Sequence, residues 1–230
     1  AQASFDAWVK YYRQDENTPN QTVSYYTKGS HVALCLDLAL RAEGASSLDD
    51  VMRALWQRSQ GGPITEGDIL AVVGELGSPA IAAQLRQWVH GTDELPLAEL
   101  LARHGVKAQA EPAQLAQRLG LRVQENHGLQ IRNVLHGGPA EQAGMMAGDE
   151  WLAVESPAGA DCWRVTRLDD VPLYAGDAPE LIAWVARDRQ VLRLQLPWGA
   201  ARQEAGAAPS NLGLEISDRD AARRWLDGAR

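Results

Sequence analysis

The stretch Ser24-Tyr-Tyr-Thr-Lys-Gly-Ser-His-Val-Ala-Leu-Cys-Leu-Asp-Leu-Ala-Leu-Arg41 decides the fold of the first half of this 230-residue chain. Val32 and four leucines recur through it with alanines between them, so a helix formed by it is apolar on nearly every side. A helix of this kind needs other helices around it to keep water away from its side chains. The sequence therefore predicts a bundle of helices with residues 24–41 at its centre.

The residues that follow contain the signals of further helices, each opened by a residue that favours a helix start. The expected starts are Ser46 or Ser47, Thr65, Ser78-Pro79 and Leu97. The last of these helices is expected to stop at Gly105. Ahead of the central stretch we expect a short helix at Ser4–Tyr12 and a turn-rich loop at Arg13–Asn20, whose Asn, Asp and Pro residues favour non-helical backbone.

From Val106 onward, short alternating segments replace the helical pattern. The expected strands are Leu121–Glu125, Leu129–Leu135, Glu150–Val154, Glu180–Arg187 and Val191–Leu196. The sequence thus predicts an α+β chain with an all-α bundle at residues 1–105 and a small β-rich domain at 106–200. Residues 201–230 are expected to form a loose linker to Ser210, a strand at Leu212–Ile216 and a helix at Asp218–Leu226 that packs back on the body.

Charge and hydropathy exclude two classes of partner. The formal net charge is −8, which disfavours a basic surface for nucleic acid. No apolar run is long enough and free enough of charge to span a membrane. The chain starts at Ala1 with no initiator Met and no signal-like segment, so we expect a fragment of a larger protein.

A self-sufficient catalytic or metal site is not recognisable in the sequence. The five histidines are scattered, and none forms the His-Glu-x-x-His pattern that places two zinc ligands on one helix face. Phosphate-binding and dinucleotide-binding glycine patterns and the Gly-x-Ser-x-Gly nucleophile turn are also absent. The sequence predicts no metal ligands and no cofactor within this segment.

The most informative local motif is His136-Gly-Gly-Pro-Ala-Glu-Gln-Ala-Gly-Met-Met-Ala-Gly-Asp-Glu-Trp-Leu-Ala-Val154. Pro139 is expected to start a short helix that Gly144 ends, and Gly148-Asp149 turns the chain into a strand. This motif resembles the signature of bacterial PDZ domains.

The PDZ resemblance makes Arg118-Leu119-Gly120-Leu121 the candidate carboxylate-binding loop. It implies that a peptide or protein C-terminus adds to the strand beginning at Leu121, with its carboxylate among backbone N–H groups of the loop. The alternative is that Leu119 and Leu121 are core residues and that the groove is empty or blocked.

A second resemblance covers essentially the whole chain. The segments Phe5–Trp8, Tyr11–Asn20, Ser24–Gly29, Leu36–Leu38, Ser47–Trp56 and His90–Pro96, followed by the PDZ-like motif, resemble the C-terminal portion of the glycyl aminopeptidase family. Those enzymes are bacterial and archaeal zinc metallopeptidases of the thermolysin-like kind that carry a PDZ domain. The resemblance implies that the zinc-binding half lies outside this segment, so zinc is expected only in the full-length parent.

Within that family resemblance, Tyr26-Thr-Lys-Gly29 matches a Tyr-x-Lys-Gly motif whose tyrosine donates a hydrogen bond to the tetrahedral oxyanion. A phenol suits this role because it is neutral at pH 7 and can donate to charge that develops in the transition state. Tyr26 is therefore the candidate catalytic residue, with Tyr25 as the competing one. The alternative is that both tyrosines only pack at a helix start.

Two functions follow as hypotheses. The first is the C-terminal portion of a zinc metallo-aminopeptidase, inactive alone, whose partner is the missing N-terminal catalytic half. The second is a non-catalytic PDZ module that binds C-terminal carboxylates. An apolar face normally covered by the missing half would favour a homodimer.

Overall fold

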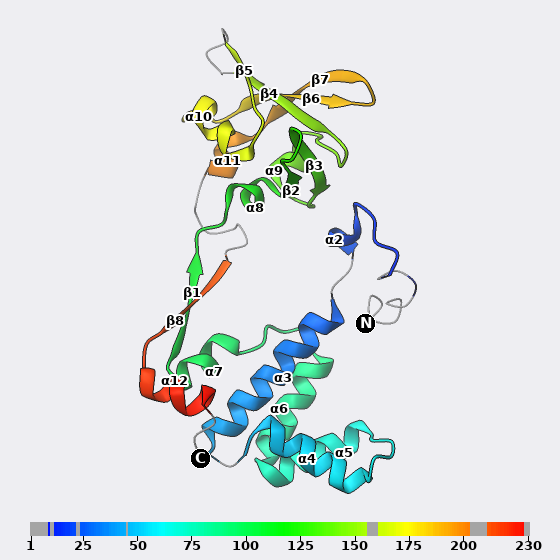
Figure 1. The fold of residues 1–230 in the computed structure, drawn as a ribbon, viewed down its shortest axis with the longest axis vertical. Helices are drawn as coiled ribbons and strands as arrows, with labels where there is room; N and C mark the ends of the chain where they lie inside the picture. The colour runs from blue at the N-terminus through cyan, green and yellow to red at the C-terminus, as the bar shows by residue number, and fades with distance from the viewer. Residues whose placement is uncertain are drawn as a thin grey trace. The chain divides into compact units, whose positions relative to one another are not determined.

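The chain forms two compact units, seen in a computed structural model that describes residues 9, 12–21, 24–44, 46–155, 161–202 and 211–227 (Figure 1). The helical unit consists of Ser24–Ala110 and Leu212–Arg230, and the β unit of Ala1–Val23 and Glu111–Asn211. The expected helix at Ser4–Tyr12 lies almost entirely outside the described residues, as does most of the expected linker at Ala200–Ser210. None of the described helices is both long enough and apolar enough to cross a membrane.

The helical unit is built around α3, which spans Tyr25–Ala42. The elements around it are α4 (Leu48–Ser59), α5 (Glu66–Leu76), α6 (Pro79–His90), α7 (Leu97–Arg103) and α12 (Arg219–Leu226). The starts of α4, α5 and α6 are capped by the hydroxyls of Ser47, Thr65 and Ser78, as the sequence predicts. Asp50 and Asp68 complete capping boxes with Ser47 and Thr65.

The core of the helical unit lies along α3. Its residues Cys35, Leu38 and Leu40 are fully buried, and the core also contains Val51 of α4, Val72 and Val73 of α5, Leu85 of α6, Leu100 and Leu101 of α7 and Ala222 of α12. Burying a side chain of this size contributes about 1.5–3 kcal/mol. Because residues of five other helices join those of α3 in one core, α3 has the central position expected from the sequence.

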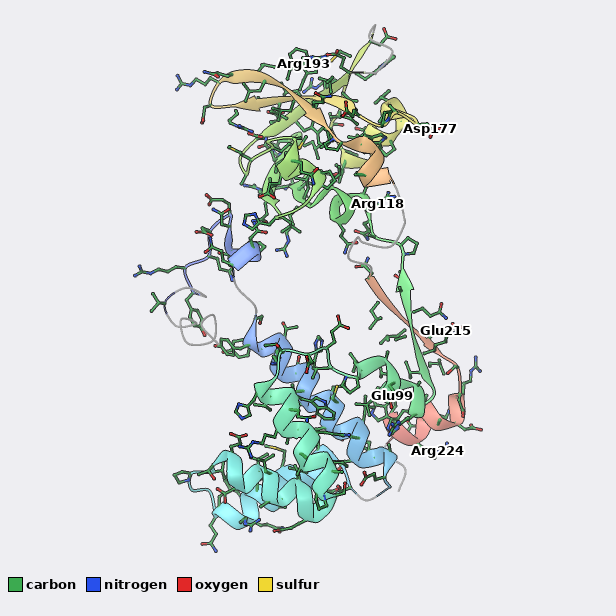
Figure 2. All side chains as sticks on the ribbon, turned by 180° about the vertical axis from the view of Figure 1, so that it is seen from behind. Glu99, Arg118, Asp177, Arg193, Glu215 and Arg224 are labelled. Carbon is green, nitrogen blue, oxygen red and sulfur yellow. The ribbon has the colours of Figure 1, made fainter. Side chains whose placement is uncertain are left out.

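The helical unit also contains a two-stranded sheet, formed by β1 (Val106–Glu111) and β8 (Asn211–Ile216). Gln109 Nε2 of β1 donates to Glu215 Oε2 of β8 at 2.7 Å, and Figure 2 labels Glu215 on β8. The chain is a mixed α/β protein with about 47% helix and 22% strand, so the prediction of an all-α bundle followed by a β-rich domain is wrong. The pattern failed here because only Val106 of β1 is buried, and the pairing joins segments about a hundred residues apart.

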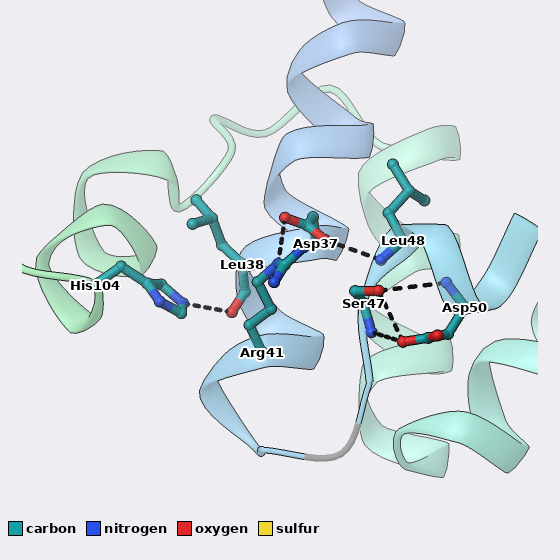
Figure 3. Close-up of polar contacts among 7 residues, drawn as sticks. All are labelled: Asp37, Leu38, Arg41, Ser47, Leu48, Asp50 and His104. Carbon is teal, nitrogen blue, oxygen red and sulfur yellow. Dashed lines mark hydrogen bonds and ion pairs between the residues drawn. The ribbon is translucent and has the colours of Figure 1, made fainter. Parts of the chain in front are cut away.

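Polar groups brace α3 at the level of Asp37 (Figure 3). The Asp37 carboxylate accepts from Arg41 Nε at 2.8 Å and from the backbone N–H of Leu48 at 2.9 Å, which ties the start of α4 to α3. On the other side, Nε2 of buried His104 lies 2.8 Å from the carbonyl oxygen of Leu38. Because a carbonyl only accepts, His104 holds its proton on Nε2. These contacts orient α4 and the end of α7 on α3.

The β unit is a twisted antiparallel sheet with the strand order β2-β3-β4-β6-β7 and with β5 paired to β4. The strands are β2 (Leu121–Gln124), β3 (Leu129–Val134), β4 (Glu150–Glu155), β5 (Cys162–Arg164), β6 (Leu181–Arg187) and β7 (Gln190–Leu196). Its short helices are α2 (Thr18–Gln21), α8 (Leu115–Leu119), α9 (Pro139–Gln142), η2 (Leu168–Asp170), α10 (Val171–Ala175) and α11 (Trp198–Arg202). β2 and β7 lie at the two ends of this strand order, and β5 is a further edge strand because it pairs only with β4 among the described strands.

A buried ion pair closes the core of the β unit. The Asp149 side chain is fully buried, and its two oxygens accept from Arg187 Nε and Nη2, both at 2.7 Å. Asp149 also accepts from the backbone N–H of Met146, and Arg187 donates to the carbonyl of Gly144. Hydrogen bonding to Asp149 raises the pKa of Arg187. The turn after α9 is therefore pinned to β6.

We expect Asp149→Ala to destabilise the β unit by about 1.5–3 kcal/mol, because it removes a fully buried carboxylate and leaves the half-buried Arg187 guanidinium and the N–H of Met146 without their acceptor. The measurement is the free energy of unfolding by denaturant, followed by tryptophan fluorescence from Trp151 and Trp198 in the same core. Asp188→Asn in the β6–β7 turn removes the same charge at an exposed site whose positive φ suits Asn, and should change little. A loss below 1 kcal/mol for Asp149→Ala contradicts the structural role.

Candidate functional site

The start of α3 presents two tyrosines. Ser24 caps the helix by accepting a hydrogen bond from the N–H of Thr27, and Tyr25 and Tyr26 occupy the first turn. Their rings lie against each other, with centroids 4.3 Å apart. Tyr26 is 60% exposed, whereas Tyr25 is half-buried. Tyr26 is therefore the more accessible phenol, and it lies at the positive end of an 18-residue helix.

Lys28 connects the same turn to the end of α6. Its Nζ donates to the carbonyl oxygen of Gly91 at 2.7 Å, and Gly91 is the residue that ends α6. An ammonium group is favoured there because the carbonyls at a helix C-terminus carry partial negative charge. The contact fixes the first turn of α3 beside the end of α6, so the backbone under Tyr26 is well anchored.

The described residues contain no group of three or more His, Cys, Asp or Glu side chains that could hold a metal ion. The histidine nearest in sequence to the Lys28 contact, His90, pairs instead with Glu66 at the start of α5, with Nε2 2.7 Å from Oε1. The side chains present in the described part of the chain therefore do not fit a zinc site. The chemistry they offer at this end of α3 is hydrogen-bond donation and positive potential.

The candidate carboxylate loop lies in the β unit, between α8 and β2. Gly120 ends α8 in the left-handed conformation, with φ of 73°, and its backbone passes so close to Gly138 that a Cβ on Gly120 would lie 3.1 Å from the Gly138 Cα. The side chains of Leu119 and Leu121 are buried in the core. Core packing of these two leucines was the alternative interpretation of the loop, and their side chains do lie in the core, so from this loop a ligand could meet the backbone and Arg118 (Figure 2).

A groove of about 870 Å³ lies along the outer side of β2. Its lining residues are Gln114, Leu115, Ala116 and Arg118 from α8, Val123–Asn126 from the end of β2, and Leu168, Asp169 and Pro172 from η2 and α10. β2 pairs only with β3 among the described strands, so its other edge is open, and Val123 and Gln124 at the end of β2 line the groove. An edge of this kind can pair with an added extended peptide.

The second wall of the groove is held to β2 by hydrogen bonds. The Glu125 carboxylate accepts from the N–H of Leu168 at 2.8 Å. Asp170 accepts from the N–H groups of Thr166 and Arg167 at 3.0 and 2.9 Å, and these bonds lower the pKa of Asp170. The sequence predicted the loop at Arg118–Leu121 but not this wall. The available signal was Asp170 followed by Pro172, which is typical of a helix start.

A short N-terminal segment docks on β3. The Asn20 side chain donates from Nδ2 to the Val134 carbonyl at 2.8 Å and accepts at Oδ1 from the N–H of His136 at 3.0 Å. Asn133 Nδ2 donates to the Glu16 carbonyl at 2.9 Å. The Asn20 amide thus takes the place of a neighbouring strand beside the end of β3, where the expected turn-rich loop contains the helical turn α2.

Comparison with known proteins gives two findings on the family. A family model described as M61 glycyl aminopeptidase matches residues 1–32, which include Tyr25, Tyr26 and Lys28. A crystal structure of an aminopeptidase N family protein from Idiomarina loihiensis matches with a TM-score of 0.76 and 26% identity, over 97% of this chain and 40% of that chain. Together these two matches support a relationship of the chain to M61 aminopeptidase-like proteins.

The chain spans only 40% of that Idiomarina protein. A structure titled as the HtrA-type protease AlgW with a decapeptide also matches, with 20% identity, over 61% of this chain and 36% of that chain. Its TM-score of 0.25 is too low to carry an argument. No curated protein matches the chain.

We expect Asn20→Ala to release the segment ahead of α3 from the β unit, because two backbone groups at the end of β3 lose their partner. Hydrogen exchange of the His136 amide should then accelerate, while exchange in the middle of β6 stays unchanged. Asn17→Ala is the matched control, since the hydrogen bond of Asn17 within this turn runs from its backbone N–H. Unchanged protection of His136 in Asn20→Ala contradicts the docking role.

Proposed function

We propose that this chain is the C-terminal portion of an M61-type metallo-aminopeptidase and that Tyr26 supplies a hydrogen bond to the tetrahedral oxyanion. The observation that carries the proposal is the exposed Tyr26 phenol in the capped first turn of α3, within the segment matched by the M61 model. Zinc would come from a part of the parent protein outside this chain, so we assign no step to a metal here.

The geometry supports an electrostatic role for this turn. An oxyanion gains from a neutral donor and from the positive end of a helix, and both are present at Tyr26. Lys28 adds positive charge nearby, although its Nζ is already bonded to Gly91. None of these groups is suited to act as a general base at neutral pH. We therefore propose that the chain contributes transition-state stabilisation and that it is inactive alone.

In the full-length parent, Tyr26→Phe should lower kcat by about 10²–10³-fold with little change in KM, because the donor acts on charge present only in the transition state. The assay is hydrolysis of glycyl or alanyl amide substrates. Tyr174→Phe in the β unit is the matched control and should retain full activity. If Tyr25→Phe causes the loss and Tyr26→Phe does not, the role moves to Tyr25.

The isolated 230-residue chain should neither bind zinc stoichiometrically nor hydrolyse these substrates. Stoichiometric zinc together with turnover would overturn the proposal that the zinc site lies in a part of the parent protein outside this chain.

The second candidate function is recognition of peptide C-termini by the β unit, acting as a PDZ-like module. The groove beside β2, with Arg118 and the Gly120 turn at the end where β2 begins, favours it. In this function a peptide pairs with the free edge of β2, and its carboxylate lies at the backbone N–H groups after α8.

A short labelled peptide with an apolar C-terminal residue tests this second function. Fluorescence anisotropy should show micromolar binding to the full 230-residue chain, and amidation of the peptide C-terminus should abolish it because the carboxylate is then lost. Equal binding of the free and amidated peptides removes carboxylate recognition from the function.

A further inference from the structure

The groove beside β2 carries opposite charges at its two ends. Arg118 lies on α8, next to the Gly120 turn where β2 begins. Glu125 lies just past the end of β2, and Asp169 lies in η2 on the facing wall. The lining also includes the apolar residues Leu115, Val123, Leu168 and Pro172, beside the amides of Gln114 and Gln124. A ligand that fills the groove along β2 therefore meets positive potential at the start of β2, near Arg118, and negative potential at the far end, near Glu125 and Asp169.

The two carboxylates at the far end differ in their availability. Glu125 already accepts from the N–H of Leu168 and lies 3.6 Å from Arg167, which offsets its charge. Asp169 is exposed, and its carboxylate makes no hydrogen bond or ion pair with any described residue. Asp169 is therefore the group in this wall that is open to a ligand, with Glu125 adding to the negative potential around it.

The order of charges along β2 sets the direction and the register of the ligand. A peptide that adds antiparallel to β2 with its carboxylate at the Gly120 turn runs from the Glu125 end of the strand toward Leu121. Strand residues pair one to one and advance about 3.3 Å each, so Glu125, four residues after Leu121, faces the peptide four residues before its end. The irregularity between Arg122 and Val123 can shift this by one residue.

We propose that the groove selects peptides that have a lysine or arginine at the third or fourth residue before the C-terminal one, and that Asp169 is the residue that selects it. This proposal rests on the second candidate function, because it assumes that a C-terminal peptide occupies the groove. It adds a preference that backbone pairing and carboxylate capture do not supply, since those contacts are the same for every sequence.

The test uses short labelled peptides of alanine and serine that end in valine with a free carboxylate and carry Lys, Ala or Glu at the third or fourth residue before the last. With the full 230-residue chain at low salt, fluorescence anisotropy should give a dissociation constant roughly five- to tenfold lower for Lys than for Glu. The ratio should fall toward one at an ionic strength of about 1 M, where charges are screened within about 3 Å.

Two variants locate the preference. Asp169→Asn keeps the shape of an exposed side chain and should bring the Lys-to-Glu ratio close to one. Asp188→Asn in the β6–β7 turn removes the same charge away from the groove lining and should leave the ratio unchanged. An equal fall in both variants means that net charge alone produces the preference, and this result overturns the proposal.

Failure of this proposal is distinguishable from failure of the function on which it rests. Binding that needs the free carboxylate but is equal for Lys, Ala and Glu peptides overturns the basic preference and leaves carboxylate recognition in place. Absence of carboxylate-dependent binding for every peptide overturns both. Binding that prefers Lys but survives C-terminal amidation also overturns the proposal, because the register from the Gly120 turn is then wrong.

Discussion

The requirement to cover α3 on every side constrains the helical unit more than any other feature. Its second half contains the buried residues Cys35, Leu36, Leu38, Ala39 and Leu40, and one helix cannot cover them all, so α4, α6, α7 and α12 contribute to the same core. The first turn of α3 is outside this core and exposes Tyr26. The core packing of its second half fixes the position of α3, and its first turn exposes the Tyr26 side chain. This is the arrangement that a precisely placed hydrogen-bond donor requires.

The local elements could be predicted from the sequence because their signals are local. Ser47, Thr65 and Ser78 cap the helices that follow them, and the strands at Leu129 and Leu181 alternate as half-buried strands do. The long-range partners could not be predicted. Val106–Glu111 alternates only weakly, and nothing in it indicates a pairing with Asn211–Ile216. Likewise, Asp149 belongs to a recognisable turn motif, but its partner Arg187 is defined only by the folded sheet.

The candidate sites also differ in how much of each depends on local sequence and how much on long-range contacts. The Tyr26 turn was found because the chemistry, the helix start and the family motif lie within six residues. The carboxylate loop was also local, but Leu119 and Leu121 point into the core, so the side-chain lining comes from elsewhere. Leu168 and Asp169 reach the groove from more than forty residues away, through the contact of Leu168 with Glu125. A single sequence can indicate a candidate loop but not which distant residues lie opposite it.

The strands at the two ends of the β sheet, β2 and β7, differ in how open their edges are. An open edge is a risk for a folded protein because it can pair with any extended chain. β7 is the longer edge, and Arg193 on it is paired with Glu155, whose pKa is lowered by this contact. β2 is a short strand with an irregularity after Arg122, which limits the length that a neighbour can pair with. Its open edge is enclosed between α8 and η2, so an incoming chain must fit between side chains as well as pair with the backbone. Because the walls restrict what can enter, side chains as well as backbone pairing would decide which extended chain can add to this edge.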